Sequence, residues 1–407
     1  MEGHSQDRAR QAGQPRRGII SRMLTLGVLA VSALMVLAAC GPNVDKPYST
    51  LTPASPTADD VQGLYKLLFW LSLVVFVSVQ FAIIYLALRY KRRSSVTKRP
   101  PQIHGNHRLE IIWTIIPAIV LLILLIPTIS TLYEHHAAAE EGDLVVDVYG
   151  KRWWWEFEYA NDTTQGEDLD VWTANELYLP VGKNVQLRLQ SNNVIHSFWV
   201  PQLSGKLDVI PGHVNLLSIT PTKIGEYYGE CAEYCGAQHA WMRFKINVVS
   251  EEDFYNWVNN WRTSPATTVR GEASDTVIKA PDAFSVCLGC HRVNGMEGSV
   301  MPEGITSPAN VGPNLTMVAC RETIGAGIIE MTPENLRNWL HDPEAVKPGN
   351  YMGDMIKPGV LSDEQIDELV DFIFSMKPEG GCTAADGWAG GTAGSEATPV
   401  ASPVPGS

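Results

Sequence analysis

Two long apolar runs near the start of the chain give its strongest pattern. Residues 67–88 and 111–132 are each about 20 mostly apolar residues long, which is enough to cross the hydrocarbon core of a bilayer as a helix. The short stretch between them is basic, and its positive residues are Arg89, Lys91, Arg92, Arg93, Lys98 and Arg99. Because short basic loops stay in the cytoplasm, the pattern predicts a transmembrane hairpin over 61–136 with both ends outside. The chain beyond residue 140 is then exported.

The N-terminal residues are organised like a signal peptide. An apolar stretch at 24–37 follows a group of arginines, which are Arg8, Arg10, Arg16, Arg17 and Arg22. A basic start, an apolar core and small residues at the exit predict a signal peptide over 1–39. The closing LAAC resembles a bacterial lipobox, which implies cleavage before Cys40 and a lipid on its sulfur. An uncleaved N-terminal helix is the alternative. Residues 40–60, rich in Pro, Ser and Thr, are expected to form a tether.

From residue 143 to 249 the pattern changes to short strand-like runs separated by turns. LVVDVYG, NVQLRLQ, LLSIT and MRFKINVV are examples. They predict a small antiparallel β-sandwich or barrel in a domain at 140–262, which closes with a short helix over DFYNWVNNW. A polar linker at 263–276 follows.

Residues 277–380 predict a small helical unit. In TPENLRNWL, Thr332 is a candidate N-cap and Pro333 occupies the first helical position. SDEQIDELVDFIFSM starts with a capping box, Ser362 with Gln365, ahead of apolar residues at helical spacing. Residues 383–407 consist mainly of Gly, Ala, Thr and Pro and are expected to be disordered.

Charge and cysteine usage narrow the classes of function. The net charge of −13 argues against nucleic-acid binding and is compatible with basic protein partners. The seven cysteines form no regular disulfide framework, and most of them lie in motifs that favour cofactor binding. Cys320 and Cys382 lie outside such motifs, and in an oxidising compartment they either pair or remain free.

The segment CAEYCGAQHAWM places four soft ligands in one loop. They are Cys231, Cys235, His239 and Met242, and His196 in NNVIHSFWVP can meet them from a separate strand. Thiolate, thioether and imidazole together suit a redox copper site better than structural zinc, which rarely takes Met. A disulfide or a zinc loop is the alternative.

A second motif, CLGCH, predicts covalent haem. Cys287 and Cys290 would form thioethers to a c-type haem, and His291 would bind its iron. The opposite ligand is expected to be a methionine. Its candidates are Met352, Met355, Met296, Met301, Met317 and Met331.

The HSFWVP segment and the pattern C-x-E-x-C-x-x-x-H-x-x-M resemble subunit II of bacterial cytochrome c oxidases. The resemblance implies a cupredoxin-like domain with a binuclear Cu(A) site. Its ligands would be His196, Cys231, Cys235, His239, Met242 and the backbone carbonyl of Glu233. The Glu233 side chain would face a magnesium ion at the contact with subunit I.

Three further positions match the family outside the copper loop. Glu110, in HRLEIIWTIIPA, stands where a glutamate opens a proton path into subunit I. Trp153, in GKRWWWEFEY, stands where an exposed tryptophan receives electrons from cytochrome c. Asp208, in LSGKLDVIPG, matches an acidic position near that contact, although His213 replaces the usual Arg. Packing at Trp153 and an isolated carboxylate at Glu110 are the structural alternatives.

The C-terminal unit resembles class I cytochromes c. HDPEAVKPGNYM matches their K-P-G-N-x-M loop and favours Met352 over Met355, although Gly353 replaces the usual Pro. VGPNL, at 311–315, resembles the loop in which a proline, here Pro313, supports the haem histidine.

Taken together, the resemblance implies a membrane-anchored protein with a two-helix hairpin, a cupredoxin-like domain and a small all-α cytochrome c domain, on the outer face of a bacterial plasma membrane. An external donor (a cytochrome c, a copper protein or a quinol-oxidising complex) would reduce haem c, and electrons would pass through Cu(A) to subunit I, which reduces oxygen and pumps protons. Subunit III is a further expected partner. A Cu(A) subunit of a nitric oxide reductase and a copper-delivery protein are the alternatives, and Glu110 and Glu233 favour the oxidase.

Overall fold

The structure, a computed structural model, describes most of the chain after residue 47. The described residues are 27, 31, 32, 48–91, 105–135, 142–159, 169, 171–264, 266–268, 277–293, 312–378 and 382. The chain divides into two compact units, 1–46 and 47–407. Nearly all of the expected signal peptide, Cys40 and the tail at 383–407 lie outside the described residues, as do Met296 and Met301.

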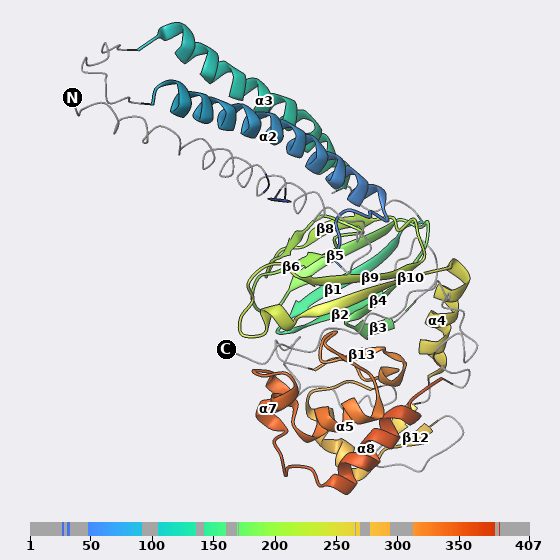
Figure 1. Cartoon of the computed structure of the whole chain (residues 1–407). Coiled ribbons are helices and arrows are strands. Elements are labelled where there is room, and N and C mark those ends of the chain that lie inside the picture. The colour runs from blue at the N-terminus through green and yellow to red at the C-terminus, as the bar shows by residue number, and fades with distance from the viewer. Residues whose placement is uncertain are drawn as a thin grey trace, which may run out of the picture. The chain divides into compact units, whose positions relative to one another are not determined.

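The two apolar runs form long helices, α2 (Pro56–Arg89) and α3 (His107–His135), which lie along each other in Figure 1. Both are long and apolar enough to cross a membrane, judged by length and composition. At about 1.5 Å per residue, the 34 residues of α2 exceed the thickness of a hydrocarbon core of about 30 Å. The helix is therefore longer than such a layer is thick.

The first turn of α2 is anchored on the strand-rich domain that follows. Ser55 caps the helix by accepting from the backbone N–H of Ala58 (3.0 Å), and its hydroxyl donates to the carbonyl of Leu203 (2.6 Å). The backbone N–H of Ala54 donates to Gln202 (2.8 Å). Ala54 and Ser55, near the end of the expected tether, are therefore buried and hydrogen-bonded to the strand-rich domain.

Two five-stranded sheets form the domain that we call the sandwich domain, residues 142–264 (Figure 1). The first has the order β3-β2-β1-β5-β8, with β1 Leu144–Lys151, β2 Trp154–Tyr159, β3 Val171–Ala174, β5 Val185–Ser191 and β8 Asn215–Ile219. The second has the order β4-β10-β9-β6-β7, with β4 Glu176–Pro180, β6 His196–Trp199, β7 Leu207–Val209, β9 Gly225–Cys231 and β10 Arg243–Val249.

The prediction of an antiparallel sandwich is wrong in one respect. β1 pairs with β5 in parallel, and β4 pairs with β10 in parallel, whereas the other pairs in these two sheets are antiparallel. The chain changes sheet between β3 and β4 and again between β4 and β5. A strand that arrives from the opposite sheet can run in the same direction as its new neighbour. The alternation of apolar and polar residues within a strand does not show the direction of its neighbour, so the parallel pairs could not be predicted.

An aromatic core holds the two sheets together. Trp155, Phe198 and Phe244 are fully or almost fully buried, with ring centroids of Trp155 and Phe198 5.6 Å apart and those of Phe198 and Phe244 4.6 Å apart. Burying one such side chain contributes roughly 1.5–3 kcal/mol. Helix α4 (Glu251–Thr263) closes one side, where Trp257 stacks on Tyr178 at 4.6 Å.

The C-terminal unit, residues 277–382, is mainly helical. Its helices are η2 Asp282–Gly289, η3 Val318–Cys320, α5 Pro333–His341, α6 Pro343–Val346, α7 Tyr351–Met355 and α8 Asp363–Ser375. The Thr332 cap and the Ser362–Gln365 capping box are confirmed. Short strand pairs are added by β13 (Thr323–Ile324) with β14 (Ile329–Glu330), and by β11 (Ala266–Thr268), in the expected linker, with β12 (Val277–Lys279).

The open question about Cys320 and Cys382 is answered by a disulfide between them. Their Cα atoms are 4.9 Å apart, within the bridging range of about 4.4–6.8 Å. The bond links η3 to the residues after α8. The other described cysteines, Cys231, Cys235, Cys287 and Cys290, are free thiols.

Candidate functional site

The five side chains predicted to bind copper come together at one end of the sandwich domain. The Sγ atoms of Cys231 and Cys235 are 3.8 Å apart, and His196 Nδ1 lies 3.9 Å from Cys231 Sγ. His239 Nδ1 and Met242 Sδ each lie 3.8 Å from Cys235 Sγ. One ligand atom each from His196, Cys231 and Cys235 falls within 4.8 Å of the others. The convergence expected between the two separated segments is therefore present.

The strands fix this arrangement by holding both ends of the loop 231–242, which we call the thiolate loop. Cys231 ends β9, and its backbone N–H donates to the carbonyl of Met242 (3.0 Å), just before β10 begins. β6 brings His196 alongside, because Phe198 is in register with Cys231. The ligands are thus held by paired strands instead of by a free loop.

The His196 ring is fixed by two neighbours. Its Nε2 lies 3.0 Å from Asn193 Oδ1, which leaves Nδ1 directed at the sulfur atoms. Gly150 in β1 lies against the ring, and a Cβ at that position would come 2.8 Å from His196 Cδ2. His196 is completely buried. The positions of Gly150 and Asn193 next to His196 could not be predicted from the sequence, because neither residue belongs to a metal-binding motif.

The two thiols form a single acid–base unit. Hydrogen bonding from Cys235 lowers the pKa of Cys231 to about 3, and the same bond raises the pKa of Cys235. This hydrogen bond favours the thiolate form of Cys231, and imidazole and thioether groups lie beside the two sulfur atoms. A soft set of this kind is well suited to copper. The carbonyl oxygen of Glu233 lies 3.2 Å from Cys231 Sγ, and its side chain is exposed.

The CLGCH motif forms a tight turn at the end of η2. The backbone N–H groups of Cys290 and His291 both donate to the carbonyl of Cys287, at 3.1 and 3.0 Å. The side chain of Cys290 is exposed and that of Cys287 is half-buried. The turn presents both thiols and the imidazole from a short stretch of chain, as covalent attachment of one haem requires.

His291 is positioned by the segment that follows residue 311. Its Nδ1 lies 2.7 Å from the carbonyl of Pro313, which leaves Nε2 for a metal. Burial lowers the pKa of His291 and so favours the neutral form that binds iron. Gly312 lies beneath the ring, and a Cβ there would come 2.7 Å from Nδ1. These neighbours fit the haem ligand predicted from the motif.

The candidate methionines have different surroundings. Met352 packs against the core of the C-terminal unit, and its Sδ lies 3.2 Å from Trp339 Nε1. Met355 is 69% exposed, and Met317 is buried against the core of the sandwich domain. Met331 is partly buried in the core of the C-terminal unit. Of the described candidates, Met352 and Met331 are the two that pack against the core of the C-terminal unit.

The three positions expected to serve electron and proton transfer lie in different parts of the fold. Trp153 is half-buried, and its Nε1 donates to the carbonyl of Cys235 (3.0 Å). Asp208 is exposed on β7, in register with Ser197. Glu110, in the first turn of α3, accepts from the backbone N–H of Asn106 (3.0 Å). Of these three residues, Trp153 is the one that is hydrogen-bonded to a residue of the sulfur cluster.

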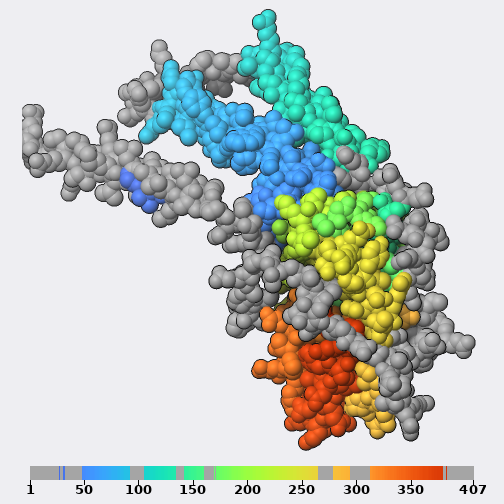
Figure 2. All heavy atoms as spheres, turned by 90° about the vertical axis from the view of Figure 1, so that its right-hand side faces the viewer, coloured from blue at the N-terminus to red at the C-terminus, as the bar shows by residue number. Residues whose placement is uncertain are grey.

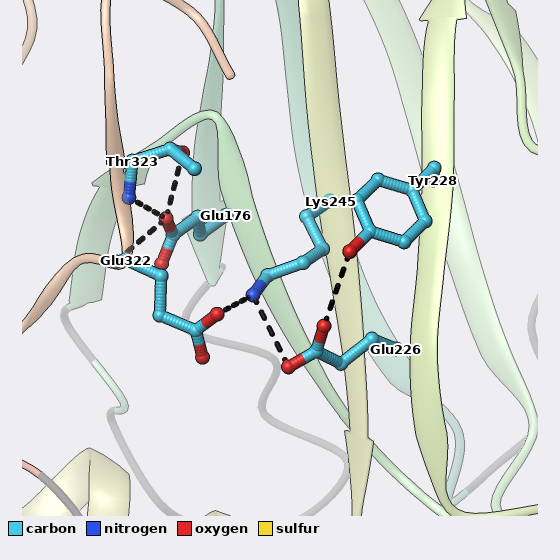
Figure 3. Close-up of polar contacts among 6 residues, drawn as sticks. All are labelled: Glu176, Glu226, Tyr228, Lys245, Glu322 and Thr323. Atoms are coloured by element: carbon cyan, nitrogen blue, oxygen red, sulfur yellow. Dashed lines mark hydrogen bonds and ion pairs between the residues drawn. The ribbon is translucent and has the colours of Figure 1, made fainter. Parts of the chain in front are cut away.

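A polar cluster that the sequence did not predict joins the two soluble parts (Figure 3). Glu176 Oε1 accepts from the backbone N–H groups of Glu322 and Thr323, each at 2.9 Å, and from the Thr323 hydroxyl at 2.9 Å. Lys245 on β10 forms ion pairs with Glu322 and with Glu226. In Figure 2 the orange and red residues of the C-terminal unit adjoin the yellow part of the sandwich domain. The two parts are therefore docked.

Two of the four charged side chains in this contact, Glu176 and Lys245, are buried, and Glu226 and Glu322 are about half exposed. Burial alone would lower the pKa of Lys245, but Glu176, Glu322 and Glu226 together raise it. Burial raises the pKa of Glu176, and Lys245 offsets part of this effect. Glu176 and Lys245 are charged residues within strands that are otherwise mainly apolar. This pattern in the sequence could have indicated a polar contact here.

Comparisons with known proteins agree across the chain. Family models match the periplasmic domain of cytochrome c oxidase subunit II at residues 144–249, its transmembrane domain at 50–131, and cytochrome c at 279–377. Cytochrome c oxidase subunit 2 of Bacillus sp. strain PS3 is 35% identical over 85% of this chain and 95% of its own length. The Bacillus subtilis protein of the same name is 32% identical, over 85% of this chain and 95% of its own.

A solved structure also matches the sandwich domain in sequence. It is the periplasmic domain of subunit II of cytochrome oxidase from Bradyrhizobium japonicum, which is 31% identical. The match covers 30% of this chain and 95% of that chain, with a TM-score of 0.26.

Proposed function

We propose, since this chain belongs to the cytochrome c oxidase subunit II family, that it carries electrons from haem c in its C-terminal unit to Cu(A) in its sandwich domain. The chain is the membrane-anchored subunit through which a terminal oxidase receives electrons, and subunit I is its partner. Its family models imply both Cu(A) and haem c. The alternatives based on nitric oxide reductase and copper delivery are not needed.

The copper-binding residues would be the cluster at the end of the sandwich domain. We assign Cys231, Cys235, His196, His239 and Met242 as the side chains that would hold the copper pair. The Glu233 carbonyl is assigned as a further ligand, supported by its distance of 3.2 Å from Cys231 Sγ. Paired strands hold these residues in place, so they change position little when the charge of the site changes.

The haem-binding residues would be Cys287 and Cys290 for covalent attachment, and His291 and Met352 would bind the iron. The bond of His291 to the Pro313 carbonyl orients the imidazole, and Met352 packs, partly buried, against the core of the C-terminal unit. When bound, the haem and the copper pair each accept and release one electron at a time.

The finer arrangement in the cell is also a proposal. The hairpin of α2 and α3 would cross the bacterial plasma membrane twice, with the soluble parts on the outer face. An external donor, which is a cytochrome c, a copper protein or a quinol-oxidising complex, would reduce the C-terminal unit. Subunit III would complete the complex. Three family positions keep their proposed roles, with Trp153 next to the copper ligands, Glu110 at a proton path and Asp208 near a contact, and Glu233 is proposed to face magnesium.

The observation that carries this proposal is the convergence of two free thiols, two imidazoles and a thioether within 4 Å contacts at the strand ends. It is tested on the oxidase purified with subunit I. Electron spin resonance should give the delocalised signal of a copper pair together with the absorption of low-spin haem c, and reduction of haem c should be followed by reduction of copper. A preparation that contains haem c but no copper after reconstitution would contradict the proposal.

A further inference from the structure

The C-terminal unit contacts the thiolate loop through the segment that leads into α7. Gln238, which is almost completely buried, donates to the carbonyl oxygens of Lys347 (3.1 Å) and Pro348 (2.7 Å). Gly349, at φ +81°, lies close enough that a Cβ there would be 3.7 Å from Ala237 Cβ. The residues just before Met352 are therefore fixed directly on the loop that carries the sulfur ligands.

Next to this contact, two aromatic rings from the two parts stack on each other. The rings of Trp153 and Tyr351 have centroids 5.0 Å apart and an interplanar angle of 19°. This spacing is within the range of favourable aromatic pairs, about 4.5–7 Å. The guanidinium of Arg152 lies 5.9 Å from the Tyr351 ring centre and adds a cation–π contact. Both rings are half-buried, so the stack is shielded from water on at least one side.

The stack connects the two candidate sites through few steps. Tyr351 is covalently adjacent to Met352, whose sulfur is the proposed haem ligand. Trp153 donates its ring N–H to the carbonyl of Cys235, whose sulfur is in the copper cluster. Between the two sulfur atoms the route consists of covalent bonds, one hydrogen bond and a single contact between stacked rings.

We propose that Tyr351 is the bridging residue through which the C-terminal unit passes electrons to Trp153 and so to the Cys235 side of the copper cluster. This inference rests on the proposed function and adds to it a residue that the C-terminal unit supplies. One electron leaves reduced haem c and one arrives at the oxidised copper pair. No bond forms or breaks and no proton moves, and the two rings act as a medium that is itself neither oxidised nor reduced.

A second connection next to the thiolate loop, through Gln238, is longer. A route through Gln238 must follow the backbone from Met352 back to Pro348, cross a hydrogen bond, and then follow the Gln238 side chain to reach His239. Electronic coupling decreases with each added covalent bond, and this route includes a run of backbone bonds that the stacked rings bypass. The contact through Gln238 is therefore assigned to docking, and the ring contact to electron transfer.

The test compares Tyr351→Leu, which removes the ring, with Tyr351→Phe, which keeps it, in the complete oxidase. Haem c is reduced by a light pulse with a photoactivated one-electron donor, and absorption follows the loss of reduced haem c and the reduction of copper. We expect Tyr351→Leu to slow this internal step by an order of magnitude. Tyr351→Phe should transfer at nearly the wild-type rate, because the phenol oxygen is not part of the route.

A second measurement separates bridging from docking. The backbone N–H groups of Glu322 and Thr323 donate to Glu176 only when the two parts are docked, so their hydrogen exchange reports docking without turnover. In Tyr351→Leu these amides should remain as protected as in the wild type, and the haem and copper spectra should be unchanged. If the leucine variant does not assemble, Tyr351→Met provides the same removal of the ring.

The outcomes are distinct. A slow internal step with intact docking supports the bridge. An unchanged rate in Tyr351→Leu overturns it, as does a slow rate that coincides with loss of protection at Glu322 and Thr323, because the ring would then act only in docking. If the wild-type protein itself passes no electron from haem c to copper, the proposed function fails instead.

Discussion

The copper site and the haem site are built on the same local device but are covered by protein to very different extents. In each, a histidine proposed as a ligand lies against a glycine and has one ring nitrogen fixed by a neighbouring oxygen, from Asn193 for His196 and from Pro313 for His291. At the copper site the side chains of Cys231, Cys235 and Met242 are buried by the protein alone. At the haem site Cys290 is exposed, and Cys287 and Met352 are only partly covered.

The difference indicates whether the protein or the cofactor supplies most of the structure of each site. The residues proposed to bind copper lie on or next to paired strands, so the sandwich domain itself supplies much of their geometry. The C-terminal unit has short helices and a smaller core, and the haem would supply the surface that its thiols and methionine lack. The haem is therefore expected to be a structural part of its unit, and copper is not.

Removing each cysteine pair should have the largest effect and tests this contrast directly. Cys287→Ser with Cys290→Ser should abolish haem attachment and destabilise the C-terminal unit by more than about 4 kcal/mol, the size expected when a tightly bound ligand is lost. Cys231→Ser with Cys235→Ser should abolish copper binding but leave the sandwich domain folded. Hydrogen exchange of α8 and of β1 measures the two results. A protected α8 without haem would remove the contrast.

Met352→Leu should have the next largest effect. Loss of the thioether ligand should convert the low-spin haem spectrum to a high-spin one and lower the reduction potential, because a methionine ligand raises it. Met355→Leu is the matched control and should leave both unchanged, since Met355 is largely exposed. An unchanged spectrum in Met352→Leu would transfer the assignment to Met355.

The two glycines beneath the histidines provide an intermediate test. A Cβ at position 150 would meet the His196 ring and one at 312 would meet the His291 ring, so Gly150→Ala and Gly312→Ala should each cost about 1–3 kcal/mol. We expect Gly150→Ala to change the copper signal and Gly312→Ala to change the haem spectrum. Thermal unfolding and the two spectra report the result. Gly182→Ala is a control for backbone strain, since a Cβ there has open space around it but φ is +79°.

The ion pair between the two parts should contribute less. Glu322→Gln keeps the backbone N–H that Glu176 accepts but removes the charge that faces Lys245. Because the Glu322 side chain is about half exposed, docking should weaken by only about 0.5–1 kcal/mol, and the effect should vanish at high salt. Hydrogen exchange at Thr323 provides the measurement. Glu368→Gln, an exposed glutamate on α8, should change nothing.

The smallest expected effect is a pH dependence of docking. Burial raises the pKa of Glu176 despite the opposing effect of Lys245, so the docked state favours its protonated form. A carboxyl group with a raised pKa stabilises the docked state at low pH, and this contribution is lost as pH rises through the raised pKa. Docking measured at several pH values should therefore weaken on the alkaline side. Glu176→Gln should remove this dependence, and a dependence that persists would exclude Glu176 as its source.

The sequence predicted features whose signals are local. Apolar runs predicted α2 and α3, the caps at Thr332 and Ser362 predicted two helices, and ligand spacing identified the thiolate loop. Features set by contacts distant in sequence could not be predicted in the same way. The parallel pairing of β1 with β5 depends on how strands cross between sheets, and the contact of Glu176 with residues 322–323 depends on docking.

Some sites were predicted only in part, because a sequence motif marks the functional residue but not the residues that pack against it. His196 was expected near the thiols because a familiar motif carries it, but Gly150 and Asn193, which position its ring, have no such signal. Trp153 was expected to be either an exposed residue that receives electrons or a packing residue. It is half-buried and stacks on Tyr351, a neighbour distant in sequence that no local pattern could have indicated.

The Cys320–Cys382 disulfide places opposite chemical demands on the maturing chain. One sulfur pair must be oxidised to close that link, while Cys287 and Cys290 must stay reduced to react with haem. Cys231 and Cys235 must stay reduced as well, although their sulfur atoms are near enough to oxidise each other. Thiol–disulfide exchange therefore has to sort six sulfurs into the correct states before the cofactors are inserted, and the order of these events becomes part of how the subunit is made.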